Sequence, residues 1–572
     1  MSRRSSFWTK CLLLVCILGV PVTQGCKEPD SVPVKTDDRA EAARPIAQAV
    51  KSKERPGDDR WPKTRAERTD YRETSHYKDV LQFLEELQTK GAPISIEFIG
   101  TSTQGRRIPL VIAARPPVAT AADARRSGRP VVYVQANIHA GEVEGKEAAL
   151  MLLRDLAREP KGGVLEKIVL LVAPIYNIDG NETWGRWQEH RRSQPEPEVV
   201  GIRANGQGLD LNRDGMKAES PEMRAALRHI YTTWDPDVLI DLHATNGTRH
   251  GYQLTYSPPL HPDTQSEILD FNRDQLLSVA RRRMRVDHGL DTFVYGNLPR
   301  RGDTRGWYQS APDPRRITNY IGLRNRIGVL SEATCYLPFR QRVETTHVFV
   351  STVLEEIGRQ GAQILRLTRE ADARVVEWGL HPEKAPALTV RYKTISRGEE
   401  EILLEKSETP GRSAQITPPK EFVSQRMPVF DRFTTTRTAR FPAAYLIPAN
   451  CDETAELLIR HGIVVEKLLA DWQGAAEAFT IEKIASAERP FQGHVLKELT
   501  GRFESLRTDM PKGSYLVRTA QPLGILIFHL LEPESIDGVA AWGFLDGKLH
   551  QGKAYPIRKC YRQVNVAAER LP

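Results

Sequence analysis

Short apolar runs alternate with segments of helical periodicity over roughly the first two thirds of the chain. Apolar runs with few interruptions are typical of strands that are buried on both faces. Strands that alternate with helices predict an α/β fold with a mixed, largely parallel central sheet flanked by helices. The predicted strands are residues 94–100, 108–114, 130–138, 168–177, 237–244 and 326–333, and the clearest helices are 71–91, 144–158 and 221–234.

The pattern changes at about residues 378–390, and the runs beyond it are shorter and more strand-like. We therefore predict a larger domain over residues 66–378 and a smaller α+β domain over 379–572. The role of the smaller domain stays open, since it could shield a cleft, bind another structure or stabilise the fold. Its predicted strands are 388–395, 444–449, 513–520 and 524–533, and one long helix is predicted over 453–472.

The N-terminus has the layout of a secretory signal. Basic residues precede the apolar segment "CLLLVCILGV", which is too short to span a bilayer, so residues 1–25 are predicted to be a signal peptide. Cys26 resembles the lipid-modified cysteine of a bacterial lipoprotein, although Thr23 stands where such signals usually have leucine, and plain cleavage is the alternative. Residues 26–65 read as a flexible tether. We expect an exported protein that is periplasmic, anchored to a membrane as a lipoprotein, or secreted.

Composition narrows the function classes. A length of 572 residues allows two or three domains, each with its own core. The net charge of +8 is spread along the chain, and the densest basic run, 281–285, follows a helical pattern that is typical of a solvated face, so no nucleic-acid partner is predicted. Only Cys335, Cys451 and Cys560 remain in the body of the chain, which excludes a disulfide framework. The oligomeric state is not indicated.

Polar residues interrupt three predicted strands near their C-terminal ends. His139 and Glu142 follow "VVYVQANI", His243 follows "LIDL", and Glu332 follows "GVLS". Ligands bind outside the carboxyl ends of strands in open α/β sheets, so these side chains could converge. Two histidines and a glutamate form a recognised ligand set for catalytic zinc that leaves a fourth position for water. Taken alone, the pair of His139 and Glu142 fits a surface turn better than a metal site, and only its combination with the other motifs favours the metal.

The segment "GLDLNRDG", residues 208–215, lies between the two histidines and adds three polar side chains. Asp210 could hold the outer nitrogen of His139, as carboxylates commonly do behind a ligating imidazole. Arg213 offers a planar fork that matches a carboxylate. Together with the strand-end residues, this segment favours a metal site that acts on a substrate bearing a carboxylate.

The ordered set of motifs resembles the zinc carboxypeptidase family, whose type members are carboxypeptidases A and B. The resemblance extends over about residues 75–360 and is closest to an exported, bacterial-type member. The segment 99–113, with Arg106, is similar to the opening segment of the family. The matching motifs that follow are "HAGE" 139–142, "NIDG" 177–180, "DLNR" 210–213, His243 and "SEA" around Glu332.

The resemblance implies one Zn²⁺ bound by His139, Glu142 and His243. It implies that Glu332 activates the water as general base and then passes the proton to the leaving amine. Arg203 is the best match to the arginine that polarises the scissile carbonyl. Arg191 and Arg192 are its rivals.

The resemblance also assigns substrate binding. Asn212 and Arg213 would hold the terminal carboxylate of a peptide, and Arg106 would contact the substrate as well. The mobile tyrosine of the family is not placed, since Tyr308 and Tyr320 are equally open and each also reads as a packing residue. The residue that sets side-chain preference is not aligned, so no specificity is predicted.

The expected function is that of a zinc metallocarboxypeptidase with a peptide substrate. One alternative is an amidase of the same zinc family that acts on cell-wall peptides. Another is a non-catalytic envelope binding protein, which is disfavoured because every ligand, base and arginine role has a candidate. Cys335 lies three residues after Glu332 but has no histidine partner, and it is interpreted as a packing residue rather than a nucleophile.

Overall fold

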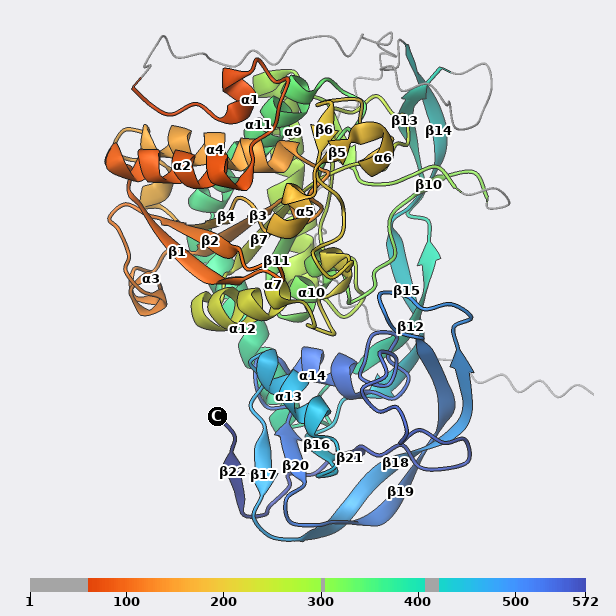
Figure 1. The fold of residues 1–572 in the computed structure, drawn as a ribbon. Coiled ribbons are helices and arrows are strands. Elements are labelled where there is room, and N and C mark those ends of the chain that lie inside the picture. Colours follow the sequence, from red (N-terminus) through yellow and green to blue (C-terminus); the bar gives the residue numbers. More distant parts are fainter. Residues whose placement is uncertain (1–59, 300–303, 407–420) are drawn as a thin grey trace, which may run out of the picture. The chain divides into compact units, whose positions relative to one another are not determined.

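The computed structural model describes residues 60–299, 304–406 and 421–572 (Figure 1). The predicted signal peptide, Cys26 and nearly all of the predicted tether lie outside these residues, so export and lipidation stay predictions. Within the described ranges, no helix has both the length and the apolar character that crossing a membrane requires.

An eight-stranded mixed sheet forms the centre of the larger part of the chain. Its four inner neighbours β4, β3, β7 and β11 are parallel, and the antiparallel pairs are β1–β2, β2–β4 and β11–β8. The six predicted strands are all present in this sheet. In sheet order the strands are β1 (Ile94–Thr101), β2 (Arg107–Ala113), β4 (Val169–Ala173), β3 (Val131–Ala136), β7 (Val238–Ala244), β11 (Ile327–Ala333), β8 (Leu254–Ser257) and β9 (Thr292–Val294).

Helices flank the sheet and bury its apolar strands. Every residue of β3 and β7 is buried, which explains their continuous apolar sequence. Helix α11 (Phe339–Arg359) packs against α4 (Glu144–Ala157) and α9 (Ser278–His288). The other helices of this part are α1 (Arg65–Arg68), α2 (Tyr77–Thr89), α3 (Ala121–Arg126), α5 (Ile178–Glu182), α6 (Trp187–His190), α7 (Pro221–Ala226), α8 (Ser266–Asp270), α10 (Ile317–Leu323) and α12 (Gly361–Leu380). Helix α7 continues as a π-helix over Leu227–Trp234, and α8 continues as a π-helix over Phe271–Leu277.

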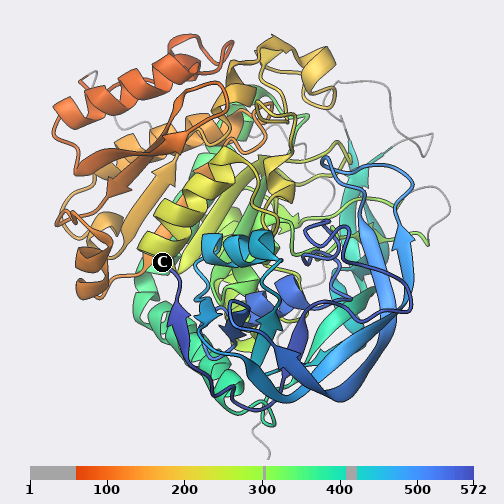
Figure 2. The same ribbon diagram turned by 60° about the horizontal axis from the view of Figure 1, so that its bottom comes forward.

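The C-terminal part is rich in antiparallel strands, and its longest strands, β18 and β19, form a hairpin (blue in Figure 2). The seven-stranded sheet has the order β19 (Lys497–Met510), β18 (Trp472–Ser486), β21 (Arg558–Cys560), β16 (Ala444–Ile447), β20 (Tyr515–Arg518), β17 (Glu466–Leu468) and β22 (Ala568–Arg570). There are three smaller sheets among the described residues. One pairs β12 (Ala387–Ile395) with β15 (Arg432–Arg440), and one has the order β10 (Trp307–Tyr308), β14 (Phe422–Phe430) and β13 (Glu399–Glu405). The third pairs β5 (Gly185–Arg186) with β6 (Val199–Val200).

Two sequence predictions in this part are wrong. The helix predicted over 453–472 ends early, as α13 (Asp452–Arg460), because Gly462 adopts a left-handed conformation with φ of 83° and turns the chain. The apolar run predicted as a strand over 524–533 is instead the helix α14 (Gly524–Leu531). All eight residues of α14 are buried, so its sequence shows no polar face from which a helical periodicity could be recognised.

The two parts of the chain share many contacts. The described residues form one compact unit, and a single cluster of buried apolar residues contains members from both sides of residue 378. The carboxylate of Asp537 lies 2.7 Å from Nε of Arg315, and the hydroxyl of Tyr320 lies 2.8 Å from Nδ1 of His461. The predicted domain boundary at residue 378 stays a prediction.

The buried imidazole of His461 makes folding sensitive to acid. Its Nε2 lies 3.0 Å from the carbonyl oxygen of Met216, and burial lowers the pKa of His461 from about 6.5 to about 3. The unfolded imidazole takes up a proton below about pH 6.5, whereas the folded one stays neutral until about pH 3. The unfolded state therefore binds more protons in this window, and stability falls as the pH falls.

We expect the residue to contribute a loss of about 1.4 kcal/mol in the free energy of unfolding between pH 7.5 and 5.5. The measurement is urea unfolding of the zinc-loaded protein at both pH values, compared with His461→Gln. Glutamine can accept from Tyr320 and donate to Met216 but does not titrate, so the variant should lose less stability. Equal losses in the two proteins would contradict this assignment.

Candidate active site

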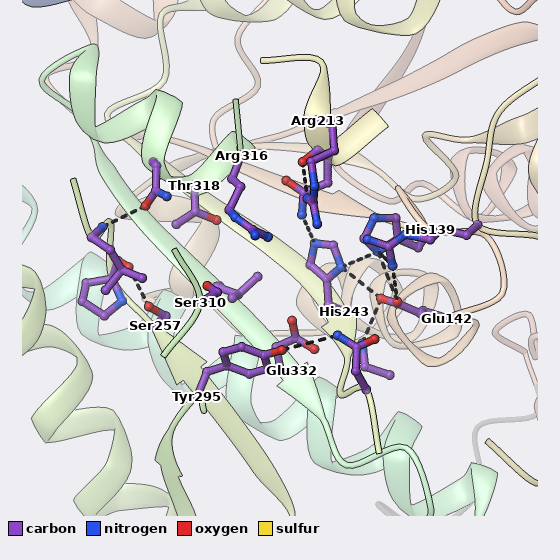
Figure 3. Close-up of a pocket in the computed structure, with 18 residues that line it drawn as sticks. His139, Glu142, Arg213, His243, Ser257, Tyr295, Ser310, Arg316, Thr318 and Glu332 are labelled. Carbon is purple, nitrogen blue, oxygen red and sulfur yellow. Dashed lines mark hydrogen bonds and ion pairs between the residues drawn. The ribbon is translucent and has the colours of Figure 1, made fainter. Parts of the chain in front are cut away.

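Local structure at the end of β3 places two polar side chains on one side of a turn. Asn137 adopts φ of 64°, and the turn that follows is closed by a hydrogen bond from the amide of Glu142 to the carbonyl of His139 at 2.9 Å. Helix α4 begins two residues later. His243 comes from β7, which runs parallel to β3 and beside it, so both histidines emerge at the same edge of the sheet. The sequence prediction that these three side chains converge is therefore met by the geometry (Figure 3).

The three side chains form a buried cluster of nitrogen and oxygen atoms. Nδ1 of His139 lies 3.1 Å from Oε1 of Glu142, and Nδ1 of His243 lies 2.9 Å from Oε2. The two Nδ1 atoms lie 3.1 Å from each other. Each residue is at most 4% exposed. We call this set of three residues the His-Glu-His cluster.

The outer nitrogens show why this cluster fits a metal ion. Nε2 of His139 lies 3.0 Å from Asp210, and Nε2 of His243 lies 2.9 Å from Asp241. When a metal ion is bound, each Nε2 would donate its proton to the carboxylate beside it and leave Nδ1 free as a ligand. Two such nitrogens and the carboxylate of Glu142 converge at 2.9–3.1 Å, as the ligands of one ion would. This donor set is one that zinc prefers.

Glu332 stands beside the cluster because of strand register. It lies on β11, which pairs with β7 in parallel, and its register partner is His243. The side chain is buried, and its Oε2 has no hydrogen-bond partner among the described residues. Burial and the nearby Glu142 raise the pKa of Glu332 to about 8, against the opposing effect of His243 and two arginines. A buried carboxylate oxygen with no partner is suited to accept a proton from water.

The three arginines proposed to polarise a carbonyl occupy different positions. Arg203 lines the pocket, with Nε 2.9 Å from Asp210 and Nη1 3.1 Å from Nδ1 of His139. Arg191 lies behind the cluster, where Nη2 contacts Glu142 at 3.2 Å, and it is not among the residues that line the pocket. Arg192 is exposed and bonds to a backbone carbonyl. Only Arg203 of these three has a guanidinium in the pocket.

Asn212 and Arg213 line the pocket next to His243. They belong to a 3₁₀ turn, Leu211–Arg213, and Oδ1 of Asn212 accepts a hydrogen bond from the amide of Ile317 at 3.0 Å. Burial, with a contribution from Arg316, lowers the pKa of Arg213 to about 10. Arg213 therefore remains a cation at neutral pH in a place where water screens it little.

Of the three residues predicted to bind substrate, Arg106 does not line the pocket, whereas Asn212 and Arg213 do. Its Nη1 lies 2.7 Å from the buried carboxylate of Asp179 and also contacts Gln104. A contact between Arg106 and a substrate would have to be made outside the pocket lining, and it stays a prediction.

Sequence reasoning missed several residues of the pocket. Tyr295 lies near Glu332 in Figure 3, and burial, with a smaller contribution from Glu332, raises its pKa to about 12. Tyr308 and Tyr320, the two tyrosines considered from sequence, do not line the pocket. Arg316 does, and the adjacent pair of arginines at 315–316 was the only signal that could have found it. The other additions are Ala244, Asn246, Ser257, Pro258, Leu260, Ser310, Thr318, Asn319 and Leu330.

A second group of possible ligands lies elsewhere and is already paired. His261, Asp263 and His529 offer atoms within 4.8 Å of one another. However, Asp263 accepts from His529 at 2.8 Å and from the amide of Thr389, so its oxygens are in use. Cys335, for its part, is buried against Ala244 and Tyr336, in accordance with a packing role.

The fold and the site define a hydrolase with a single metal ion at the carboxyl edge of a mixed sheet. Residues 80–311 match the zinc carboxypeptidase family. Its cofactor is zinc. Glu332 and Arg316 lie beyond the matched stretch, so their placement rests on the structure.

The chain is similar to several proteins that are named carboxypeptidases, among both its sequence relatives and solved structures. It is 25% identical to carboxypeptidase 2 of Trichophyton rubrum over 476 residues, which cover 80% of this chain and 81% of the relative. It is 24% identical to probable carboxypeptidase 2 of Arthroderma benhamiae, over 71% of this chain and 74% of that one. The metallo-carboxypeptidase of Burkholderia cenocepacia has a TM-score of 0.37 at 15% identity, over 50% of this chain and 69% of its own. Carboxypeptidase A of Helicoverpa armigera has a TM-score of 0.35 at 15% identity, over 50% and 74%.

Proposed function

We propose that this zinc metallocarboxypeptidase removes the C-terminal residue of peptides, with Glu332 as general base and Arg213 as the anchor of the terminal carboxylate. The observation that carries the mechanism is the unpaired Oε2 of Glu332 beside the His-Glu-His cluster. Zinc, when bound by the cluster, lowers the pKa of water and polarises the scissile carbonyl. The remaining steps are the work of side chains.

Glu332 takes a proton from water through its free oxygen and then gives this proton to the nitrogen of the leaving amine. Its burial favours this exchange, because the carboxyl is shielded from bulk water and can keep the proton between the two steps. Arg203 donates hydrogen bonds to the oxyanion that develops on the carbonyl. Asp210 orients both Arg203 and His139, since one carboxylate contacts each of them.

Arg213 binds the terminal carboxylate and so sets which peptide bond reaches the cluster. Its side chain has no carboxylate within 4.0 Å in the part of the chain that the structure describes, and it is buried enough for an ion pair with substrate to be strong. Asn212 places this arginine by bonding to the start of α10. The protein is also proposed to act after export, as its N-terminal sequence indicates.

Peptides of one sequence with a free or an amidated C-terminus test the proposal. We expect the zinc-loaded protein to cleave only the free-ended peptides. Arg213→Gln should lower kcat/KM on them by roughly thirtyfold or more, which corresponds to about 2 kcal/mol for the loss of one partner of a desolvated charge pair. Arg282→Gln removes the same charge at an exposed position of α9 and should change nothing.

Equal cleavage of free and amidated peptides would contradict the role of Arg213. If zinc-loaded protein cleaves neither set but does cleave cell-wall peptide fragments, the amidase alternative takes the place of this proposal. Zinc binding without hydrolysis of any amide would leave the non-catalytic binding protein as the remaining candidate.

A further inference from the structure

The pocket holds one more cation than the proposed reaction uses. Arg203 is assigned to the oxyanion and Arg213 to the terminal carboxylate, but Arg316 also lines the pocket. Figure 3 shows the side chain of Arg316 beside Thr318, on the side of the pocket away from Glu142. If Arg213 holds the terminal carboxylate, the side chain of the C-terminal residue would extend into the part of the pocket that Arg316 lines.

Arg316 has only one long ion pair, with Asp313, among the described residues. Its Nε is buried and makes no hydrogen bond, and the nearest carboxylate oxygen, Oδ2 of Asp313, is 3.9 Å away. The other oxygen of Asp313 already accepts the hydroxyl of Tyr392 at 2.6 Å. The side chain is 27% exposed, and a partly buried cation without a close hydrogen-bonded anion favours a ligand that brings a carboxylate.

The backbone around Arg316 is held firmly on both sides. The preceding residue, Arg315, donates its amide to Asp537 at 2.8 Å and its Nε lies 2.7 Å from the same carboxylate, which is fully buried. The following amide, of Ile317, donates to Asn212. Asn212 immediately precedes Arg213 in the chain. The hydrogen bond from Ile317 to Asn212 therefore holds the backbone of Arg213 and that of Arg316 at a defined spacing before substrate binds. Such preorganisation lowers the entropy cost of binding two charges at once.

The rest of this region suits an acidic side chain and opposes a basic one. Ser310 and Thr318 add hydroxyls, and Leu260 adds an apolar wall for methylene groups. The only carboxylates among the lining residues are Glu142 and Glu332, both of which belong to the metal half of the pocket. No described residue that lines this side of the pocket therefore offers an anion to a C-terminal lysine or arginine, and the nearby Asp313 is already paired with Arg316 and Tyr392.

We propose that Arg316 binds the side-chain carboxylate of a C-terminal glutamate or aspartate, so that the enzyme prefers peptides that end in an acidic residue. The inference rests on the proposed function, in which Arg213 holds the terminal carboxylate. Arg316 is then the residue that determines specificity, and a dicarboxylate at the end of the peptide pairs with both arginines.

The test uses one peptide series that ends in Glu, Gln, Leu or Lys with a free carboxylate. We expect kcat/KM for Glu to exceed that for Gln, its neutral isostere, by about 10- to 100-fold. Arg316→Gln should bring the ratio of Glu to Gln close to one while cleavage of the Leu peptide is retained. Arg316→Lys should keep a smaller preference for Glu, and Arg316→Glu should favour Lys. Arg282→Gln, a loss of charge outside the pocket, should keep the wild-type ratio.

The ratio of two substrates within one variant is unaffected by a partly misfolded sample, so each comparison stays decisive. A uniform loss on all free-ended peptides in Arg316→Gln would overturn the inference, because Arg316 would then help to hold the terminal carboxylate. Equal rates on Glu and Gln in the wild type would overturn it alone and leave the carboxypeptidase function standing. Absence of cleavage of every free-ended peptide would instead overturn the proposed function and this inference with it.

Discussion

Replacement of Glu332 by glutamine is expected to lower kcat for peptide hydrolysis by about 10²- to 10⁴-fold, the contribution that a positioned general base usually makes. Glutamine has nearly the same shape but cannot accept and return a proton. The side chain lies in a pocket where Oε2 has no protein partner within the described ranges, so the substitution breaks no hydrogen bond made by that atom. The fold should be unaffected, and the loss should fall on kcat rather than KM.

Zinc content is the measurement that separates this role from a structural one. Glu332 is not part of the His-Glu-His cluster, so Glu332→Gln should retain one zinc per chain. Glu222→Gln is a matched control, because Glu222 is a buried glutamate of α7 that does not line the pocket. It should keep wild-type kcat. Near-normal kcat in Glu332→Gln would refute the assignment of the general base, and loss of zinc would move Glu332 into the metal site.

The second large effect is expected from the cluster itself. His243→Ala removes one of the two nitrogens that converge at 3.1 Å, and the protein should then fail to retain zinc and lose activity. The wild type stripped of metal by a chelator should recover activity and gain thermal stability when zinc is added back, since a ligand that binds only the folded state stabilises it. His243→Ala should show neither response.

Asp241→Asn provides a graded control for this experiment. Asp241 contacts the outer nitrogen of His243 at 2.9 Å without reaching the cluster. Loss of such an outer partner typically lowers metal affinity by about 10- to 100-fold, which is less than the loss of a ligand. Zinc binding in His243→Ala as tight as in the wild type would show that the metal lies elsewhere.

The central sheet and the metal half of the site were predictable from sequence because short-range rules determine them. Buried parallel strands must be apolar along their length, so β3, β7 and β11 could be recognised one by one. Polar residues at the C-terminal ends of neighbouring parallel strands all lie at the carboxyl edge of the sheet. His139, Glu142, His243 and Glu332 were predicted on this basis, and the parallel register of β7 and β11 accounts for the last two.

The apolar C-terminal segments show where periodicity fails. Helix α14 is buried on every side, so no polar face distinguished it from a strand. Helix α13 ends at Arg460, shortly before Gly462, which adopts a left-handed conformation. The error at α14 arose because tertiary packing selected the structure, whereas the end of α13 follows from a glycine that is visible in the sequence.

The two ends of the pocket thus differ in how they are specified. The sequence by itself determined the sheet and the convergence of His139, Glu142, His243 and Glu332 at its carboxyl edge, since both follow from the order of residues along a strand and the parallel arrangement of neighbours. The roles of zinc ligand and general base came from the resemblance to a family. Only the tertiary structure decided that Arg316 lines the pocket. The same holds for the hydrogen bond of 2.7 Å that the amide of Asp210 donates to Gln492, which lies 282 residues further along the chain. Those contacts come from loops and a hairpin tip without a repeating side-chain direction, so their neighbours are set by packing between distant segments.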